Sequence, residues 1–142
     1  MKKIRTIALI LTAVLMAGIF ASCSSETTEV TVMLIIEAGD DVFFDSKVTV
    51  DVENPTIMNV VKEVMIMYPE VPIVLNDSED SIKDVGEYTE HQEDNMAYFW
   101  EYTINGILPD NQTGGKANAQ PVKEGDVIMY VYSSYDMSQA AG

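Results

Sequence analysis

The segment from Trp100 to Tyr132 constrains the fold of this 142-residue chain more than any other, because it contains two strand-and-turn signals. From Trp100 to Ile104, aromatic and branched apolar residues alternate with polar ones and lead into Asn105-Gly106, a dipeptide typical of tight hairpin turns. Gly125-Asp126 precedes a second apolar run, from Val127 to Tyr132. Glycine adopts turn angles that other residues disfavour, and aspartate accepts hydrogen bonds from the amides of its own turn. The segment therefore predicts two half-buried strands, and it contains no catalytic motif.

Upstream, the apolar pattern predicts two further strands and a connecting turn. The β-branched run from Val30 to Ile36 is typical of a strand, and the alternation from Lys47 to Val52 is typical of a second. Gly39-Asp40-Asp41 marks a turn or loop between them.

The middle of the chain predicts one helix. Apolar residues recur at helical spacing from Ile57 to Tyr68, Asn54-Pro55-Thr56 offers two candidate N-caps, and Pro69 ends the pattern. Two shorter strands are indicated at Ile73 to Leu75 and at Ile82 to Val85, and Gly86 to Asn95 has the composition of a polar loop. Strands interrupted by one helix indicate an α+β fold in which the helix crosses the sheet.

The motif Trp100-x-Tyr102-x-Ile104-Asn105-Gly106, followed by Lys123-x-Gly125-Asp126-x-Ile128, resembles the transcobalamin C-terminal-like family of small extracellular β-grasp domains. The resemblance extends over roughly residues 46 to 132 and includes the helix start Thr56-Ile57-x-x-Val60-Val61. It implies a β-grasp-like mixed sheet of about four to five strands packed on one main helix, and the strand order is implied by it alone. Because the family takes its name from vitamin-B12 carriers, the resemblance implies binding rather than catalysis, with a corrinoid as the candidate ligand.

The N-terminus indicates where the domain acts. Lys2, Lys3 and Arg5 precede an apolar stretch, and Cys23 follows small residues at the position of the lipidated cysteine in bacterial lipoprotein signals. We therefore expect a signal peptide over residues 1–22, a lipid-anchored spacer over 23–29, a domain over 30–134 and a flexible tail over 135–142. We expect the lipid to hold the domain in the cell envelope, outside the cytoplasm. An ordinary signal peptide or an uncleaved anchor is the alternative, and each of these also exports the domain.

The charge of the chain excludes one class of partner. Its formal charge is −15, and removal of the three basic residues before Cys23 makes it −18. A surface of this charge repels phosphate backbones, so we expect no nucleic-acid binding. It also disfavours direct adhesion to anionic lipid, so membrane attachment is expected through the lipid on Cys23.

Few residues suit catalysis or metal binding. Cys23 is the only cysteine and would be consumed by lipidation, and His91 is the only histidine and lies in an acidic segment. Acidic clusters at residues 40–45 and 77–84 are interpreted as solvated, and the second lacks the glycine and the terminal glutamate of a calcium-binding EF-hand loop. We therefore expect a protein that is not an enzyme, with no catalytic residue, no metal site and no cofactor.

Two features remain as candidates for ligand contact. Tyr98, Trp100 and Tyr102 share one face of their strand, as do Tyr130 and Tyr132 of theirs, although aromatic residues on strands more often pack in the core. The loop from 107 to 120 presents amide, hydroxyl and backbone groups. The candidate ligand-binding residues are Trp100, Tyr102, Asn111, Gln112, Gly114 and Gly115.

The sequence thus predicts a lipid-anchored extracellular binding domain that takes a corrinoid or a similar small molecule at the sheet edge and the 107–120 loop. The alternative is a cell-surface module that binds a protein or a glycan through an exposed strand or loop. An apolar cleft beside the loop favours the small molecule, whereas a flat surface with an unpaired strand favours the interaction module.

Overall fold

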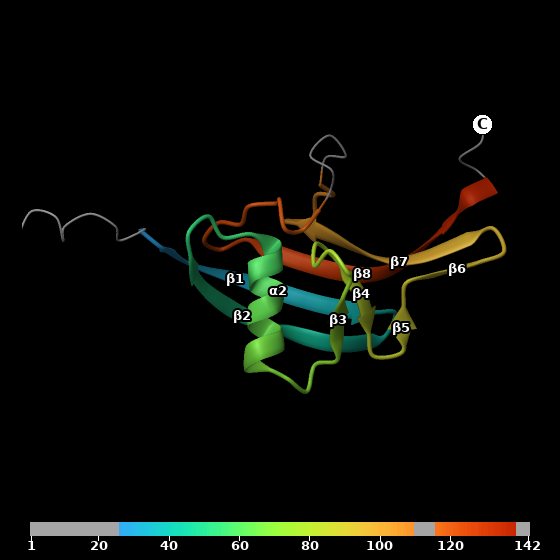
Figure 1. Cartoon of the computed structure of the whole chain (residues 1–142), viewed down its shortest axis with the longest axis horizontal. Coiled ribbons are helices and arrows are strands. Elements are labelled where there is room, and N and C mark those ends of the chain that lie inside the picture. Colours follow the sequence, from blue (N-terminus) through green and yellow to red (C-terminus); the bar gives the residue numbers. More distant parts are fainter. Residues whose placement is uncertain (1–25, 110–115, 139–142) are drawn as a thin grey trace, which may run out of the picture.

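The computed structural model describes residues 26–109 and 116–138, which form a mixed five-stranded sheet, one helix across it and a smaller three-stranded sheet (Figure 1). The large sheet has the order β2-β1-β8-β7-β6, in which β1 and β8 are parallel and the other neighbours are antiparallel. The small sheet has the order β3-β4-β5. The elements are β1 (Thr28–Ala38), β2 (Asp41–Val52), α2 (Ile57–Met67), β3 (Ile73–Leu75), β4 (Ile82–Val85), β5 (Tyr88–Thr89), β6 (His91–Glu93), β7 (Met96–Ile104) and β8 (Val127–Asp136).

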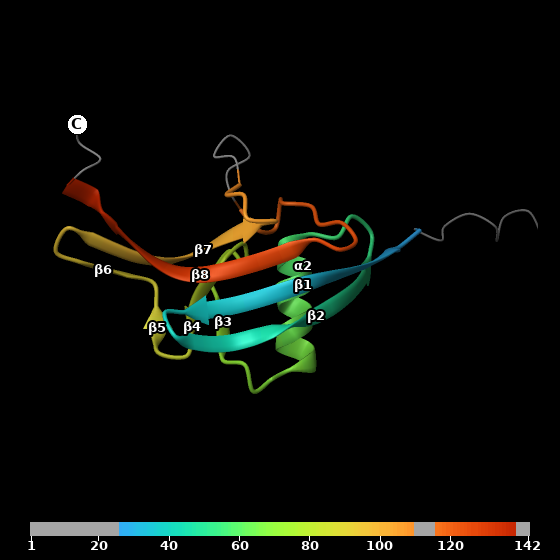
Figure 2. The ribbon, with the colours of Figure 1, turned by 180° about the vertical axis from the view of Figure 1, so that it is seen from behind.

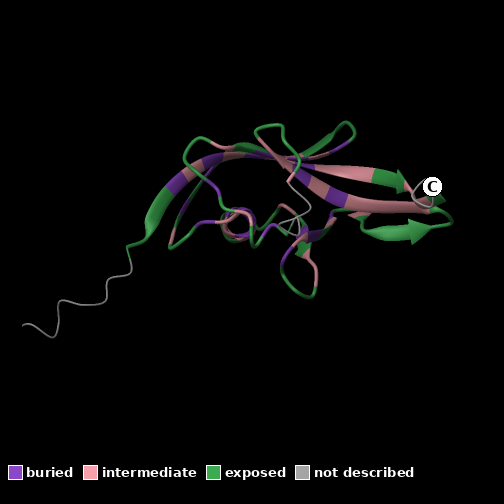
Figure 3. Cartoon of the chain, turned by 90° about the horizontal axis from the view of Figure 1, so that it is seen from above, coloured by how far each residue is buried: buried purple, intermediate pink, exposed green. Residues whose placement is uncertain are grey.

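Strands β1 and β2 form a long hairpin around Gly39, which has a φ of 60°. Along β1 every second residue from Val30 to Ala38 is buried, so one face of the sheet carries the core (Figure 3). The pairing shifts between Ile36 and Glu37, which leaves Phe43 as an extra residue in β2. The opposite face of the sheet carries no helix in the described residues (Figure 2).

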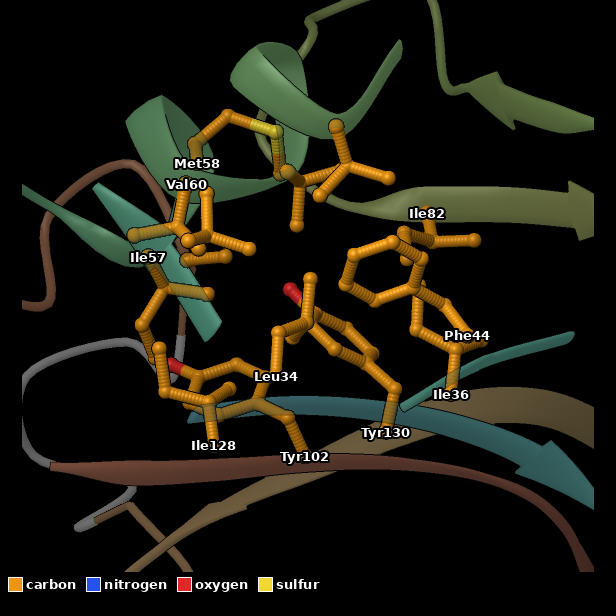
Figure 4. Packing of buried hydrophobic residues seen from close by; sticks show 14 of the residues in the cluster. Leu34, Ile36, Phe44, Ile57, Met58, Val60, Ile82, Tyr102, Ile128 and Tyr130 are labelled. Atoms are coloured by element: carbon orange, nitrogen blue, oxygen red, sulfur yellow. The ribbon is translucent and has the colours of Figure 1, made fainter. Parts of the chain in front are cut away.

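Helix α2 begins at Ile57 and is preceded by Thr56, whose side chain accepts a hydrogen bond from the backbone N–H of Asn59. The Asn59 side chain accepts one from the Thr56 backbone at 2.9 Å, which completes a reciprocal capping box and confirms Thr56 as the N-cap. The helix lays its apolar stripe on the sheet, where Ile57 and Val60 are fully buried beside residues of β1 and β8 (Figure 4). The helix therefore closes one core between itself and the large sheet.

Both turns predicted between Trp100 and Tyr132 are confirmed. Asn105 and Gly106 have φ values of 53° and 76°, and Ile104 and Ile107 exchange two backbone hydrogen bonds of 3.0 Å around them. Gly125 has a φ of 80°, and the Asp126 carboxylate accepts a hydrogen bond from the Lys123 amide at 2.8 Å. These turns fix where β7 ends and where β8 begins.

The structure corrects the expected balance of the fold. The mixed large sheet of five strands agrees with the expectation. The proportion of helix does not, because the described residues are mostly strand and contain one short helix, and the second sheet was not expected. The segment 86–95, expected as a polar loop, contains β5 and β6, because its polar residues pair in short hairpins with one face open to solvent. β1 starts inside the expected spacer and β8 ends inside the expected tail. Within 26–109 and 116–138, no helix has the length and apolar character needed to cross a membrane.

Candidate functional site

Five aromatic residues of β7 and β8 lie together on the core side of the sheet: Tyr98, Trp100, Tyr102, Tyr130 and Tyr132. The register pairs Trp100 with Tyr132 and Tyr102 with Tyr130, and the ring centroids of these pairs are 5.3 and 5.4 Å apart. Tyr98 lies beside them, with its ring centroid 6.3 Å from that of Tyr132. Because directly opposed residues share a sheet face, the two aromatic sets predicted for separate strands form a single group.

Trp100 and Tyr102 belong to the core, since each is only 7% exposed. The Trp100 indole donates a hydrogen bond of 3.0 Å to the Tyr88 carbonyl, and burial raises the pKa of Tyr102. Tyr130 is more deeply buried, and burial also raises its pKa. These three side chains are thus part of the core, and at most 7% of each is exposed to a ligand.

Trp100, Tyr102 and Tyr130 line one wall of a cleft of about 330 Å³. Leu108 and Pro109, which follow the hairpin turn at the end of β7, also line it. We call this the aromatic cleft; its lining residues are Ser81, Trp100, Glu101, Tyr102, Leu108, Pro109 and Tyr130.

A larger cleft of about 490 Å³ adjoins the same two residues. We call it the turn cleft; it is lined by Ile104, Asn105, Ile107, Leu108, Pro109, Gln120, Pro121, Lys123 and Asp126. Ile107, which lines the turn cleft, is 72% exposed, and Leu108, which lines both clefts, is 60% exposed, so large apolar side chains stand in solvent at the rim. The predicted 107–120 loop therefore begins with an apolar rim that sequence reasoning, which emphasised its polar residues, did not single out.

The far wall of the turn cleft is fixed to the start of α2. Ile57 donates its backbone N–H to the Gln120 carbonyl at 3.0 Å, and Val122 donates to the Pro55 carbonyl at 3.0 Å. These bonds use one of the free N–H groups at the start of the helix and hold the segment that carries Pro121. The wall is consequently part of the folded core rather than a separate loop.

An ion pair anchors the start of this segment. Asp80, which is 6% exposed, accepts hydrogen bonds of 2.6 Å from Lys116 and from the Asn76 amide, and its own carbonyl accepts one from Ala117. The bond from Lys116 and then that from Asn76 hold the pKa of Asp80 below its ordinary value. Asp80 adjoins Ser81 of the aromatic cleft, so the pair also positions one side of that cleft.

Of the two charged side chains that line the turn cleft, one is bonded within the turn and the other is not paired with an acidic group in the described residues. The Asp126 carboxylate accepts hydrogen bonds from the Lys123 amide and from the Asn105 side chain at 2.9 Å, so it is committed to the turn. The Lys123 ammonium forms no ion pair with any residue in the described ranges. It is thus the charged group of this cleft that is available to a ligand.

The predicted lipidation site and four of the predicted ligand-binding residues lie outside the described residues: Cys23, Asn111, Gln112, Gly114 and Gly115. His91 is exposed, stacks on Tyr98 with centroids 4.5 Å apart, and has its Nδ1 2.8 Å from the Thr89 carbonyl. Among residues 26–109 and 116–138, no three acidic, histidine or cysteine side chains are grouped so that they could hold a metal ion.

No protein-family model matches the chain, and no curated protein matches it. Among solved structures, the chain is similar to haptocorrin in complex with Cbi, with a TM-score of 0.58 and 13% identity over 80% of this chain. The match spans 27% of the haptocorrin chain. A candidate metal-binding protein from Ruminococcus gnavus ATCC 29149 matches 75% of this chain and 98% of its own length at 14% identity, with a TM-score of 0.43. At these identities the haptocorrin match shows a shared fold.

Proposed function

We propose that this chain is a β-grasp-like binding domain that takes a flat, amphipathic small molecule across the aromatic and turn clefts. The observation that carries the proposal is the apolar rim: Leu108 is exposed where the two clefts meet, and Ile107 is exposed beside it in the turn cleft. An exposed apolar edge beside a cleft is typical of a ligand site, and a bound molecule would remove that edge from water.

A corrinoid is the ligand class that we propose. It is a broad molecule with an apolar ring face and polar amide edges, which suits an apolar rim flanked by the free Lys123 ammonium. The family resemblance in the sequence and the shared fold with haptocorrin support this choice. Because the match covers about a quarter of haptocorrin, we propose that the domain supplies one wall of the site, which implies modest affinity when it acts alone.

We further propose that the domain is not an enzyme and acts outside the cytoplasm, anchored by a lipid on Cys23. The basic start, the apolar stretch and the small residues before Cys23 support this location. Incorporation of labelled palmitate into the wild-type protein, and its loss in Cys23→Ser, is the expected result. Equal labelling of both would refute the anchor.

The ligand proposal is tested by titrating a chain that begins at Glu26, and so contains the whole core, with cobinamide and cobalamin while following absorbance and heat. Saturable binding is expected, and Leu108→Ser should weaken it by about tenfold, since Leu108 borders both clefts and a buried leucine contributes about 1.5–3 kcal/mol.

Val74→Ser is the matched control, because Val74 is also an exposed apolar residue, at 50%, but lies in β3 outside both clefts. Trp100→Ala is unsuitable as a test, since it would remove core packing together with any ligand contact. Absence of heat and of spectral change up to the solubility limit of either corrinoid would refute the ligand class. Equal weakening by both serine variants would refute the site.

A further inference from the structure

The free edge of β2 lies at the opposite side of the sheet from both clefts. Its backbone orientation follows from β1: the Thr31 carbonyl accepts a hydrogen bond from Gly125, and the Met33 N–H donates to the Asp126 carbonyl, both at 2.9 Å. Odd-numbered residues of β1 therefore direct their backbone groups towards β8, and even-numbered ones direct theirs towards β2.

The register of the hairpin carries this alternation into β2. Val32 is opposite Val48, so the even-numbered residues of β2 bond to β1. Lys47, Thr49 and Asp51 then direct their N–H and C=O groups away from the sheet, and no described residue takes up these groups in a backbone or side-chain hydrogen bond. The edge thus presents a regular row of donors and acceptors for another strand.

A groove runs beside this row on the helix side. The C-terminal end of α2 extends past β2 (Figures 1 and 2), and a hollow of about 410 Å³ separates the two elements. Ile66, at the overhanging end of the helix, is 72% exposed and lines the hollow. An added strand would therefore gain both backbone hydrogen bonds and apolar contact.

We propose that the occupant of this edge is a second copy of the chain, with two β2 strands paired antiparallel about a two-fold axis at Thr49. This register places Lys47 opposite the partner's Asp51, and symmetry repeats the pair, so two opposite-charge contacts form on the outer face of the joined sheet. On the helix side, Val48 lies opposite the partner's Val50. The two five-stranded sheets become one continuous sheet, and the clefts stay open at its two ends.

Within the bounds of β2, charge selects this register over its neighbours; the register also aligns Asp45 with the partner's Glu53, but Glu53 lies beyond the end of the strand. A shift of two residues in one direction places Asp45 opposite the partner's Asp51, which is repulsive. The shift in the other direction pairs Lys47 with the partner's Glu53, which lies beyond the end of β2, and leaves Asp51 without a cation. Lysine at a sheet edge disfavours pairing with strands of other proteins, whereas in this dimer the partner's Asp51 neutralises Lys47.

The test is a charge exchange, read by sedimentation of the chain that begins at Glu26. The wild-type protein should dimerise, and Lys47→Asp and Asp51→Lys should each weaken dimerisation by at least about tenfold, because each turns two attractions into repulsions. Both affected side chains lie on the exposed outer face, so folding should be retained. An equimolar mixture of the two variants should restore association, as should the double variant, since both recreate opposite charges at each position.

A second pair of variants tests the backbone contact. Thr49→Pro removes an outward N–H and should abolish dimerisation, whereas Thr49→Val keeps that N–H and should retain it. A wild-type protein that stays monomeric up to about 1 mM would overturn the proposal. So would single charge variants that dimerise as well as the wild type, or a mixture that fails to associate more strongly than its components.

Discussion

Tyr130 provides a test of the core, because removing its buried hydroxyl is expected to raise the free energy of unfolding rather than lower it. Its side chain is 1% exposed, and its hydroxyl has no hydrogen-bond partner among the described residues. Figure 4 shows this oxygen directed towards the apolar side chains of α2. An unpaired buried hydroxyl costs about 1–3 kcal/mol. We therefore expect Tyr130→Phe to stabilise the protein.

The net gain follows from two opposing terms. Removal of one oxygen leaves a void on the order of 10 Å³, which at about 24 cal/mol per Å³ costs only about 0.2–0.3 kcal/mol. The free energy of unfolding should therefore rise by about 1–2 kcal/mol, and Tm by about 4 °C or more for a domain of this size. Urea unfolding of the chain from Glu26 onward, followed by far-UV circular dichroism, measures the change.

Tyr132→Phe is the matched control, two residues along the same strand. The Tyr132 hydroxyl donates a hydrogen bond of 2.7 Å to the Thr89 carbonyl, so its removal should destabilise the protein by about 0.5–1.5 kcal/mol. The two identical substitutions should thus act in opposite directions. A loss of 1 kcal/mol or more in Tyr130→Phe would refute the reasoning, because it would mean that this hydroxyl has a partner in solution.

Two further predictions concern the Asp80 ion pair and the glycine turns. Because hydrogen bonds from Lys116 and Asn76 lower the pKa of Asp80 below 3.8, the ionised group stabilises the fold above about pH 4, and this contribution is lost as the pH falls through the folded-state pKa. Between about pH 6 and about pH 3, the urea midpoint of the wild type should fall further than that of Asp80→Asn; parallel falls would contradict the assignment. Gly86→Ala should destabilise more than Gly39→Ala: both positions have a φ near 60°, which costs alanine about 1–2 kcal/mol, but only a Cβ at 86 would meet a side chain, the Phe43 ring at 3.2 Å. Equal losses in thermal melts would show that Phe43 moves aside freely.

The two proposals use opposite edges of one sheet. The clefts lie at the end of β7, whereas the pairing surface is the edge of β2, and two other strands separate them. Dimerisation would therefore leave ligand binding intact. A Lys47→Asp variant that loses dimerisation but binds corrinoid normally would separate the two functions experimentally.

The local elements were predictable because their signals are local. The strands 73–75 and 82–85 have the predicted bounds, and the helix begins after Thr56, as its capping pattern indicates. The short strands β5 and β6 were missed, since their polar residues carry no apolar alternation and pair only with neighbours that the fold provides.

The candidate site was predictable only in outline. Trp100 and Tyr102 were singled out by their spacing, but their burial depends on contacts with distant segments, such as that of Trp100 with Phe43 and that of Tyr102 with Tyr130. Ile107 and Leu108 gave no periodic signal, and their importance comes from standing exposed beside two clefts. The shared face of Trp100 and Tyr132 depends on the register between strands that are distant in the sequence.

By itself, the sequence determined the turns, the helix cap, the alternation along the strands and the strongly negative charge, because each depends on residues close together in the chain or on composition alone. The tertiary structure decided which strand lies at the edge, which aromatic rings meet and where apolar side chains remain exposed. These depend on pairing between distant segments: the insertion of β8 beside β1 leaves β2 with one free edge, and no local pattern in β2 records that outcome.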